Sequence, residues 1–270
     1  MSLTLLGCAS GPESRDETLR WSPERIYQES KDEMSSGNYA QAIALLRKLE
    51  SRYPFGRFAQ QAQLDTAYAY WKEGDLAQAL SSIERFMRLN PNHPSIDYAL
   101  YLKGLINFND RATLFSSVTG EDMSERDPKA AKEAFDAFKQ LVTRFPESRY
   151  AADAAARLQF LINTLAQGEV HTARFYLRRG AFMAAVNRAQ AVIRTYQDSP
   201  AVEEALAQMI YGYDRLGLDQ LRDDAKRVLA RTAPNSPYLT HGYNPAVLTG
   251  LRPEHQPNRS PSVWTRLKLW

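Results

Sequence analysis

The chain has 270 residues, of which 44% are hydrophobic and 24% are charged, and its formal net charge is +3. These values are typical of a folded globular protein, and so slight a charge gives no reason to expect a nucleic-acid partner. A single cysteine excludes an internal disulfide and a cysteine-rich metal site. The sequence contains no run of about 18 apolar residues, so we expect no membrane-spanning helix.

The cysteine, Cys8, follows a short apolar run, Leu5-Leu6-Gly7, and precedes a polar stretch. A small residue before such a cysteine resembles the lipobox of bacterial lipoproteins, in which lipid is attached to the cysteine sulfur. Because each buried methylene contributes ~0.8 kcal/mol, several acyl chains anchor a protein without a spanning segment. We therefore expect residues 1–7 to be the remainder of a signal peptide, Cys8 to be lipidated and residues 8–22 to form a linker. A chance cysteine near the start is the alternative.

Two details of the N-terminus refine this prediction. Met1–Leu6 is too short for a complete signal peptide and lacks a basic leader, so we expect the natural start to lie upstream. Ala9, rather than an aspartate, follows the cysteine. This resembles lipoproteins that are sent on to the outer membrane.

Internal repetition organises the middle of the chain. Four predicted tight turns are marked by glycine, at Gly37, Gly74, Gly180 and Gly217. The residues 17 positions after these glycines are Pro54, Pro91, Gln197 and Pro234. A fifth unit has no glycine at its turn, but counting 17 positions back from Pro146 places that turn at Lys129. Proline ends a helix because it lacks the amide donor and clashes with the preceding turn.

Apolar residues recur at two fixed offsets after these turns. A small residue stands five positions on, and a larger one twelve positions on, which places both on one face of a helix. The small residues are Ala42, Ala79, Ala134 and Ala185, and the larger ones are Leu49, Phe86, Leu141, Val192 and Leu229. The pattern resembles the tetratricopeptide repeat, a helix–turn–helix unit. In the fifth unit Arg222 replaces the alanine, as in degenerate capping repeats.

The sequence therefore predicts an all-α fold, a tetratricopeptide-repeat superhelix of five repeats and about ten helices, with irregular N- and C-terminal segments. We expect the repeat array to span 23–236, with N-terminal repeats at 23–107, an insert at 108–127 and C-terminal repeats at 128–236. A lengthened helix is expected from about Tyr150 to Arg179. Residues 237–270 are predicted to form a flexible, Pro-rich basic tail, whose apolar end either docks on a partner or lipid or is disordered.

No catalytic constellation is found in the sequence. The histidines are His93, His171, His241 and His255, and no two of them form a metal-binding pair at helical spacing. There is no phosphate-binding glycine loop and no Gly-x-Ser-x-Gly elbow. We expect a protein that is not an enzyme and has no cofactor apart from the lipid, and that binds polypeptides in the groove which stacked helix pairs provide.

Several phrases of the sequence resemble the BamD family of outer-membrane β-barrel assembly lipoproteins. They span all but the tail, in the order of the family: Tyr53-Pro54-Phe55-Gly56, Gln60-Gln61-Ala62-Gln63-Leu64-Asp65, Arg88-Leu89-Asn90-Pro91-Asn92-His93-Pro94, Ile96-Asp97-Tyr98, Arg126-Asp127-Pro128, Arg179-Gly180-Ala181 and Ala185-Val186-Asn187-Arg188. The resemblance implies a lipid-anchored protein at the periplasmic face of the outer membrane of a Gram-negative bacterium. Its implied partners are a periplasmic domain of BamA, the other lipoproteins of the BAM complex and unfolded outer-membrane proteins.

The resemblance also implies roles for particular residues. In the family the N-terminal repeats are implicated in recognising unfolded outer-membrane proteins, which makes Phe55, Phe58, Tyr70 and Trp71 candidates here. Of these, Phe55 and Phe58 are expected to be exposed. Arg188 becomes a candidate contact for BamA, and the alternative is an exposed arginine in a weak local ion pair. A generic periplasmic repeat scaffold associated with the cell envelope or peptidoglycan is the alternative function.

Overall fold

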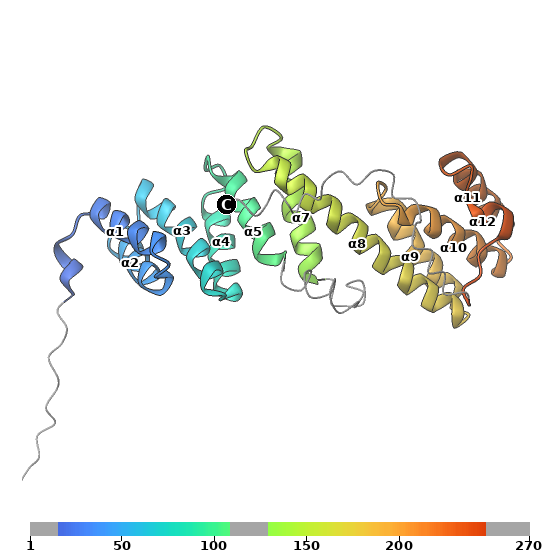
Figure 1. The fold of residues 1–270 in the computed structure, drawn as a ribbon, viewed down its shortest axis with the longest axis horizontal. Coiled ribbons are helices and arrows are strands. Elements are labelled where there is room, and N and C mark those ends of the chain that lie inside the picture. Colours follow the sequence, from blue (N-terminus) through green and yellow to red (C-terminus); the bar gives the residue numbers. More distant parts are fainter. Residues whose placement is uncertain (1–15, 109–128, 247–270) are drawn as a thin grey trace, which may run out of the picture. The chain divides into compact units, whose positions relative to one another are not determined.

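The computed structural model describes residues 16–108 and 129–246 (Figure 1). All regular structure in these ranges is helical, with eleven α-helices and one 3-10 helix. Cys8, nearly all of the predicted insert and the tail beyond residue 246 lie outside the described ranges. The elements are η1 (Glu17–Arg20), α1 (Pro23–Ser35), α2 (Tyr39–Arg52), α3 (Arg57–Glu73), α4 (Leu76–Leu89), α5 (Ile96–Asn107), α7 (Lys129–Arg144), α8 (Ala151–Arg178), α9 (Phe182–Thr195), α10 (Ala201–Arg215), α11 (Asp219–Thr232) and α12 (Pro237–His241).

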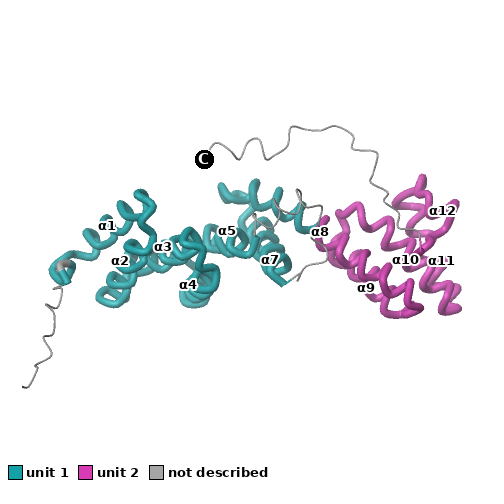
Figure 2. The backbone as a smooth tube through the Cα atoms, turned by 60° about the horizontal axis from the view of Figure 1, so that its bottom comes forward, with its two compact units in different colours: residues 1–162 teal, residues 163–270 magenta. Residues whose placement is uncertain are grey.

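The chain forms two compact units, Met1–Ile162 and Asn163–Trp270, divided within the long helix α8 (Figure 2). In the first unit, α1 packs with α2, α3 with α4, and α5 with α7. In the second unit, the C-terminal part of α8 pairs with α9, and α10 packs with α11. The five predicted helix–turn–helix repeats are confirmed, and so is the lengthened helix.

The predicted glycine turns have a common geometry, seen at Gly74. Its φ of 87° lies in the left-handed region, where a residue without a Cβ meets no steric penalty. The Gly74 N–H donates to the carbonyl of Trp71 at 3.1 Å, and the next N–H donates to the carbonyl of Tyr70 at 3.0 Å. These bonds satisfy carbonyls that the helix end leaves open. The other three predicted turns have glycine φ angles of 80°, 75° and 71°, at Gly37, Gly180 and Gly217.

The residues at the two repeat offsets form the core of each hairpin. All four alanines five positions after the turn are 0% exposed, and so are all five larger residues twelve positions after it. An alanine at this point lets the two helix backbones approach closely, and the larger side chain fills the space toward the next helix. Helices α2, α4, α7 and α11 each end two residues before the proline that the sequence singles out.

The segment before α1 is not a free linker where the structure describes it. Asp16 accepts a hydrogen bond from Lys48 Nζ at 2.9 Å and pairs with Arg52 Nη2 at 2.5 Å, both on α2. The hydrogen bonds from Lys48 and then Thr18 hold the pKa of Asp16 well below its usual range. Charge pairing thus docks residues 16–22, the last part of the predicted linker, on the first hairpin.

The first residues of the predicted tail, 237–246, make ordered contacts where the structure describes them. Ser236 caps the short helix α12, and its hydroxyl accepts from the Tyr238 N–H at 3.3 Å. The Tyr243 hydroxyl accepts from Gln208 Nε2 at 2.9 Å and donates to Glu204 Oε1 at 3.1 Å, on α10. Residues 237–246 therefore pack on α10, where Tyr243 joins a hydrogen-bond network with Gln208 and Glu204.

Helices α5 and α7 approach each other closely at Gly104 of α5. A Cβ added there would lie 2.3 Å from Cε1 of Phe138, a ring on α7 that is 0% exposed. We expect Gly104→Ala to lower the free energy of unfolding by about 1–2 kcal/mol, because overpacking outweighs the gain of about 1 kcal/mol in helix propensity. Urea denaturation followed by circular dichroism measures this. Adding Phe138→Leu is expected to relieve the clash, so the double variant should lose less stability than the sum of the two single variants. A double variant whose loss in free energy of unfolding equals that sum would contradict the close packing.

Candidate functional site

Half-buried aromatic rings form two contacting groups on the first two hairpins. Tyr27 of α1 lies 5.6 Å from Phe58 of α3, centroid to centroid. Tyr68 of α3 lies 6.4 Å from Tyr39 at the start of α2 and 5.9 Å from Trp71. We call these five residues the aromatic cluster. Such rings combine apolar area with oriented edge-to-face contacts, which suits them to hold further aromatic side chains.

A buried carboxylate accepts a hydrogen bond from one ring of the cluster. Asp65 of α3 is 5% exposed and accepts from the Tyr27 hydroxyl at 2.9 Å, from Gln61 Nε2 at 3.3 Å and from Lys31 Nζ at 3.4 Å. Burial, and then the negative charge of Asp65, raises the pKa of Tyr27 above its usual range. The same two causes raise the pKa of Tyr68. Both phenols therefore stay neutral at physiological pH, and Tyr27 remains a hydrogen-bond donor.

A lysine adds positive charge to the exposed side of the cluster. Lys72 Nζ lies 4.8 Å from the ring centroid of Trp71 and 5.6 Å from that of Tyr68. An ammonium group over an aromatic face is attracted by the ring quadrupole. The cluster is thus an apolar surface bordered by a cation, which suits a polypeptide segment with aromatic side chains and a negative charge.

The structure does not bring the four candidate residues together. Phe55 is 90% exposed, as expected, in the loop before α3. Phe58, also expected to be exposed, is instead half-buried against Tyr27, so that expectation is wrong. Trp71 belongs to the aromatic cluster, but Tyr70 lines a separate cleft. Consecutive residues of an α-helix point about 100° apart, so these last two side chains serve different faces of α3.

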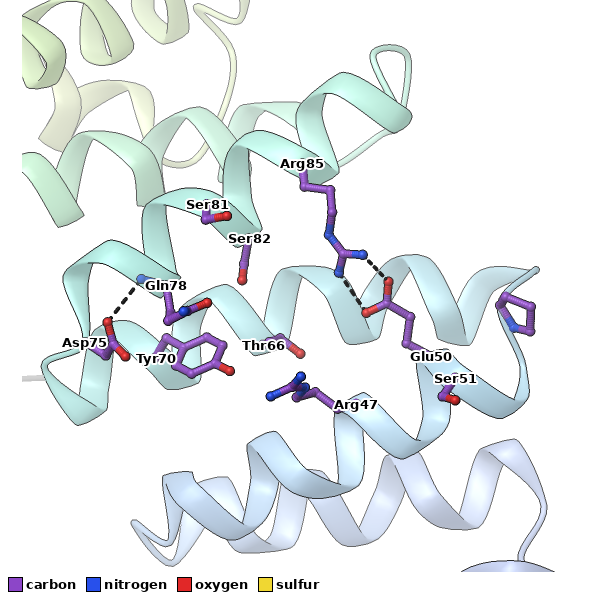
Figure 3. Close-up of a pocket in the computed structure, with 11 residues that line it drawn as sticks. Arg47, Glu50, Ser51, Thr66, Tyr70, Asp75, Gln78, Ser81, Ser82 and Arg85 are labelled. Atoms are coloured by element: carbon purple, nitrogen blue, oxygen red, sulfur yellow. Dashed lines mark hydrogen bonds and ion pairs between the residues drawn. The ribbon is translucent and has the colours of Figure 1, made fainter.

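The cleft lies between α2 and α4, with α3 as its floor, and has a volume of about 820 Å³ (Figure 3). We call it the α2/α4 cleft. Its lining is mainly polar and consists of Arg47, Glu50, Ser51, Pro54, Thr66, Tyr70, Asp75, Gln78, Ser81, Ser82 and Arg85. Glu50 of α2 and Arg85 of α4 form two charged contacts across it, at 2.7 and 2.8 Å. The sequence does not indicate that these residues are neighbours, because they come from three helices and the loops beside them.

The glutamines of the Gln60-Gln61-Ala62-Gln63 phrase have a structural role beside the cleft. Gln60 Nε2 donates to Asn90 Oδ1 at 3.1 Å, and Asn90 Nδ2 donates to Gln63 Oε1 at 3.3 Å. Gln63 Nε2 in turn donates to Glu50 Oε1 at 3.1 Å. This chain of amides fixes the loop after α4 to α3 and orients the Glu50 carboxylate.

Arg188 lies on α9 in the second unit, with 47% of its side chain exposed. Its Nη1 is 3.2 Å from Oε2 of Glu169 on α8, a carboxylate that is 14% exposed. This is the local ion pair that the sequence offers as an alternative. The guanidinium still presents its remaining donors to solvent, since about half of the side chain is accessible.

Residues 16–108 and 129–246 provide neither a metal-binding cluster nor a membrane-spanning helix. No group of three or more His, Cys, Asp or Glu side chains in these ranges is arranged to hold a metal ion. None of the described helices combines the length and the apolar character needed to cross a membrane.

A family model described as outer membrane lipoprotein (YfiO) matches residues 20–228. A protein of Neisseria meningitidis serogroup A named outer membrane protein assembly factor BamD is 48% identical over 248 residues, which cover 91% of this chain and 93% of that relative. The chain belongs to the BamD family. The BamD of Vibrio cholerae is 40% identical over 230 residues, covering 85% of this chain and 94% of its own length. A crystal structure of MamA is similar with 19% identity and a TM-score of 0.37, covering 76% of this chain and 87% of that one.

Burial of Tyr27, reinforced by the charge of Asp65, makes the stability of this BamD-family chain depend on pH in the alkaline range. A raised folded pKa means that the contribution of Tyr27 is intact below the unfolded value of about 10 and is lost as the pH rises through the folded value. We expect Asp65→Asn to lower the free energy of unfolding by about 1–3 kcal/mol at neutral pH, because a charged acceptor of buried donors is lost. We also expect its stability to fall less steeply than that of the wild type above pH ~10.

Urea denaturation at pH 8 and between about pH 10 and 11 measures both effects. Tyr27→Phe is the control, because it removes the titrating phenol and keeps the ring. Equal alkaline slopes for the wild type and both variants would show that Asp65 does not act on Tyr27.

Proposed function

We propose that this protein is a non-enzymatic lipoprotein of the outer-membrane β-barrel assembly (BAM) complex, which binds unfolded outer-membrane proteins and BamA and promotes barrel insertion. Membership of the BamD family carries the proposal, since its relatives are named as assembly factors for outer membrane proteins. Two features of the described structure support it. The repeats form preformed binding surfaces, and an aromatic cluster lies on the first two hairpins.

The aromatic cluster and Phe55 are the proposed site for unfolded outer-membrane proteins. Strands of membrane barrels carry outward-facing apolar residues and girdles of aromatic residues, which are exposed to water until the barrel inserts. The half-buried rings of Phe58 and Trp71 offer an apolar surface already held in place, so little entropy is lost when a strand binds. Phe55 extends that surface, and Tyr70 takes part from the α2/α4 cleft.

A lipid anchor and a protein interface attach the protein to the membrane and to BamA. Lipid on Cys8 holds the protein at the periplasmic face of the outer membrane, and no cofactor or nucleic acid takes part. Arg188, half exposed on α9, contacts a periplasmic domain of BamA. The other BAM lipoproteins are further partners.

Phe55 provides a clean test of substrate binding, because at 90% exposure it contributes little to the core. We expect Phe55→Ala to leave the free energy of unfolding within about 0.5 kcal/mol and to raise the Kd for a denatured barrel protein about tenfold. Fluorescence anisotropy of a labelled, urea-diluted outer-membrane protein measures this. Leu89→Ala is the matched control, since Leu89 is another apolar side chain, 60% exposed, at the end of α4. Equal weakening by both variants would indicate non-specific hydrophobic binding.

Arg188 is tested by recovery of BamA from detergent-solubilised envelopes. We expect Arg188→Glu to retain its fold by circular dichroism and to retrieve at least about tenfold less BamA, since reversing an interface charge costs the pairing and adds repulsion. Arg194→Glu is the control, on the exposed surface of the same helix.

A charge swap separates partner contact from local structure. Arg188→Glu combined with Glu169→Arg restores the ion pair between α8 and α9 but leaves the charge at position 188 reversed. Recovery of BamA by the swap would show that Arg188 acts only within the fold. Failure of the wild type itself to retrieve BamA would favour the generic envelope scaffold.

A further inference from the structure

The α2/α4 cleft lies on a different side of α3 from Phe58 of the aromatic cluster. Helix α3 packs against α2 and α4, and the cleft opens between these two helices above Thr66 and Tyr70 (Figure 3). Phe58 and Asp65, by contrast, face α1 through Tyr27. The cleft is therefore a surface that the proposed binding of aromatic segments does not use, Tyr70 excepted.

Polar groups in the cleft have unused hydrogen-bonding capacity. Thr66 is 4% exposed, lines the cleft, and its hydroxyl has no hydrogen-bond partner. Arg47 reaches into the cleft from α2 and is exposed, and no partner for its side chain is found among the described residues (Figure 3). Buried polar groups nearly always have a partner, so an orphaned hydroxyl at the floor of a polar cleft indicates that a ligand supplies one.

The charges of the cleft select the ligand. Glu50 neutralises Arg85 through two contacts, at 2.7 and 2.8 Å, and Asp75 caps α4 by accepting from the Gln78 N–H at 3.1 Å. Arg47 is thus the one cationic group of the lining without a carboxylate partner, and two carboxylates stand in the same lining. A single planar guanidinium matches a carboxylate, whereas a dianionic phosphate meets repulsion from both acids.

The wall formed by α4 suits an extended polypeptide. Four side chains of α4 line the cleft and lie along one face of the helix, because they recur at intervals of three or four residues. They are Gln78, Ser81, Ser82 and Arg85. At 1.5 Å per residue this row is about 10 Å long, the length of roughly three residues of extended chain. Its hydroxyl and amide groups both donate and accept, as the main chain of a peptide requires.

We propose that the α2/α4 cleft is a second polypeptide-binding site, in which Arg47 and the Thr66 hydroxyl hold a carboxylate of an extended partner segment. The ligand carboxylate pairs with the free guanidinium, Thr66 donates to it from the floor, and the α4 row binds the adjoining main chain. The inference goes beyond the proposed function and does not rest on it. Neither Arg47 nor Thr66 belongs to the aromatic cluster or to the Arg188 surface.

The experiment uses the full chain and labelled octapeptides of Ser and Thr that carry one central Asp, with an Asn peptide as the uncharged comparison. We expect the Asp peptide to bind at least about fivefold more tightly than the Asn peptide at low salt, because the guanidinium requires the charge. Arg47→Gln is expected to weaken the Asp peptide about tenfold and Thr66→Val about threefold. Arg88→Gln, on the exposed surface of α4, and Thr66→Ser, which keeps the hydroxyl, are expected to bind as the wild type does.

Three further readouts sharpen the test. Thr66→Val is expected to be at least as stable as the wild type, because it removes an unpartnered buried hydroxyl, so its weaker binding cannot come from unfolding. The affinities of the Asn peptide with a free and with an amidated C-terminus are compared. Tighter binding of the free form would show that a terminal carboxylate can take the place of the Asp side chain. Retained binding of a denatured barrel protein by Arg47→Gln separates this site from the aromatic cluster.

Two results would overturn the proposal. One is equal affinity for the Asp and Asn peptides, or for the wild type and Arg47→Gln. The other is competition by inorganic phosphate at concentrations at which acetate does not compete, which would make the cleft a phosphate site.

Discussion

The close approach of paired helices at a buried alanine is the contact on which the rest of the structure depends. Five positions after each of four turns stands an alanine that is 0% exposed, and any larger side chain there would push the hairpin apart. In the fifth repeat Arg222 takes this place and is half-buried, and its Nη1 pairs with Asp214 at 3.1 Å and Asp219 at 2.6 Å. A charged residue is tolerated there because acidic partners surround it.

Close hairpin packing leaves a helix such as α3 with several distinct surfaces. It contacts α2 and α4 along its length, and it also meets α1 and α5. Phe58 and Asp65 turn toward α1, and Thr66 and Tyr70 turn toward the space between α2 and α4. A single helix thereby contributes to an aromatic surface and to a polar cleft. Both surfaces are held by buried contacts, so a ligand need not order them.

The polar groups that fix these surfaces are almost all satisfied. Asp65 accepts three hydrogen bonds, and Glu50 is held by Arg85 and Gln63. Near the chain's described C-terminal end, Arg174, Glu204, Gln208 and Tyr243 form a comparable network on the second unit. Among the described residues the Thr66 hydroxyl and Gln208 Oε1 are the two exceptions, and of these only Thr66 lines the α2/α4 cleft.

Sequence alone determined the repeats, because turn glycines, buried alanines and terminal prolines act locally through backbone conformation and helical period. It also predicted the family, the exposure of Phe55 and the long helix α8. Only the tertiary structure decided that Phe58 is half-buried, that Tyr70 and Trp71 serve different surfaces and that residues 237–246 pack on the second unit. These outcomes depend on contacts between side chains that are distant in the sequence. Gln208 and Tyr243 are 35 residues apart, and Gln60 and Asn90 are 30 residues apart. A periodic pattern predicts which face of a helix is buried, but it does not predict which polar side chain of another element contacts that face.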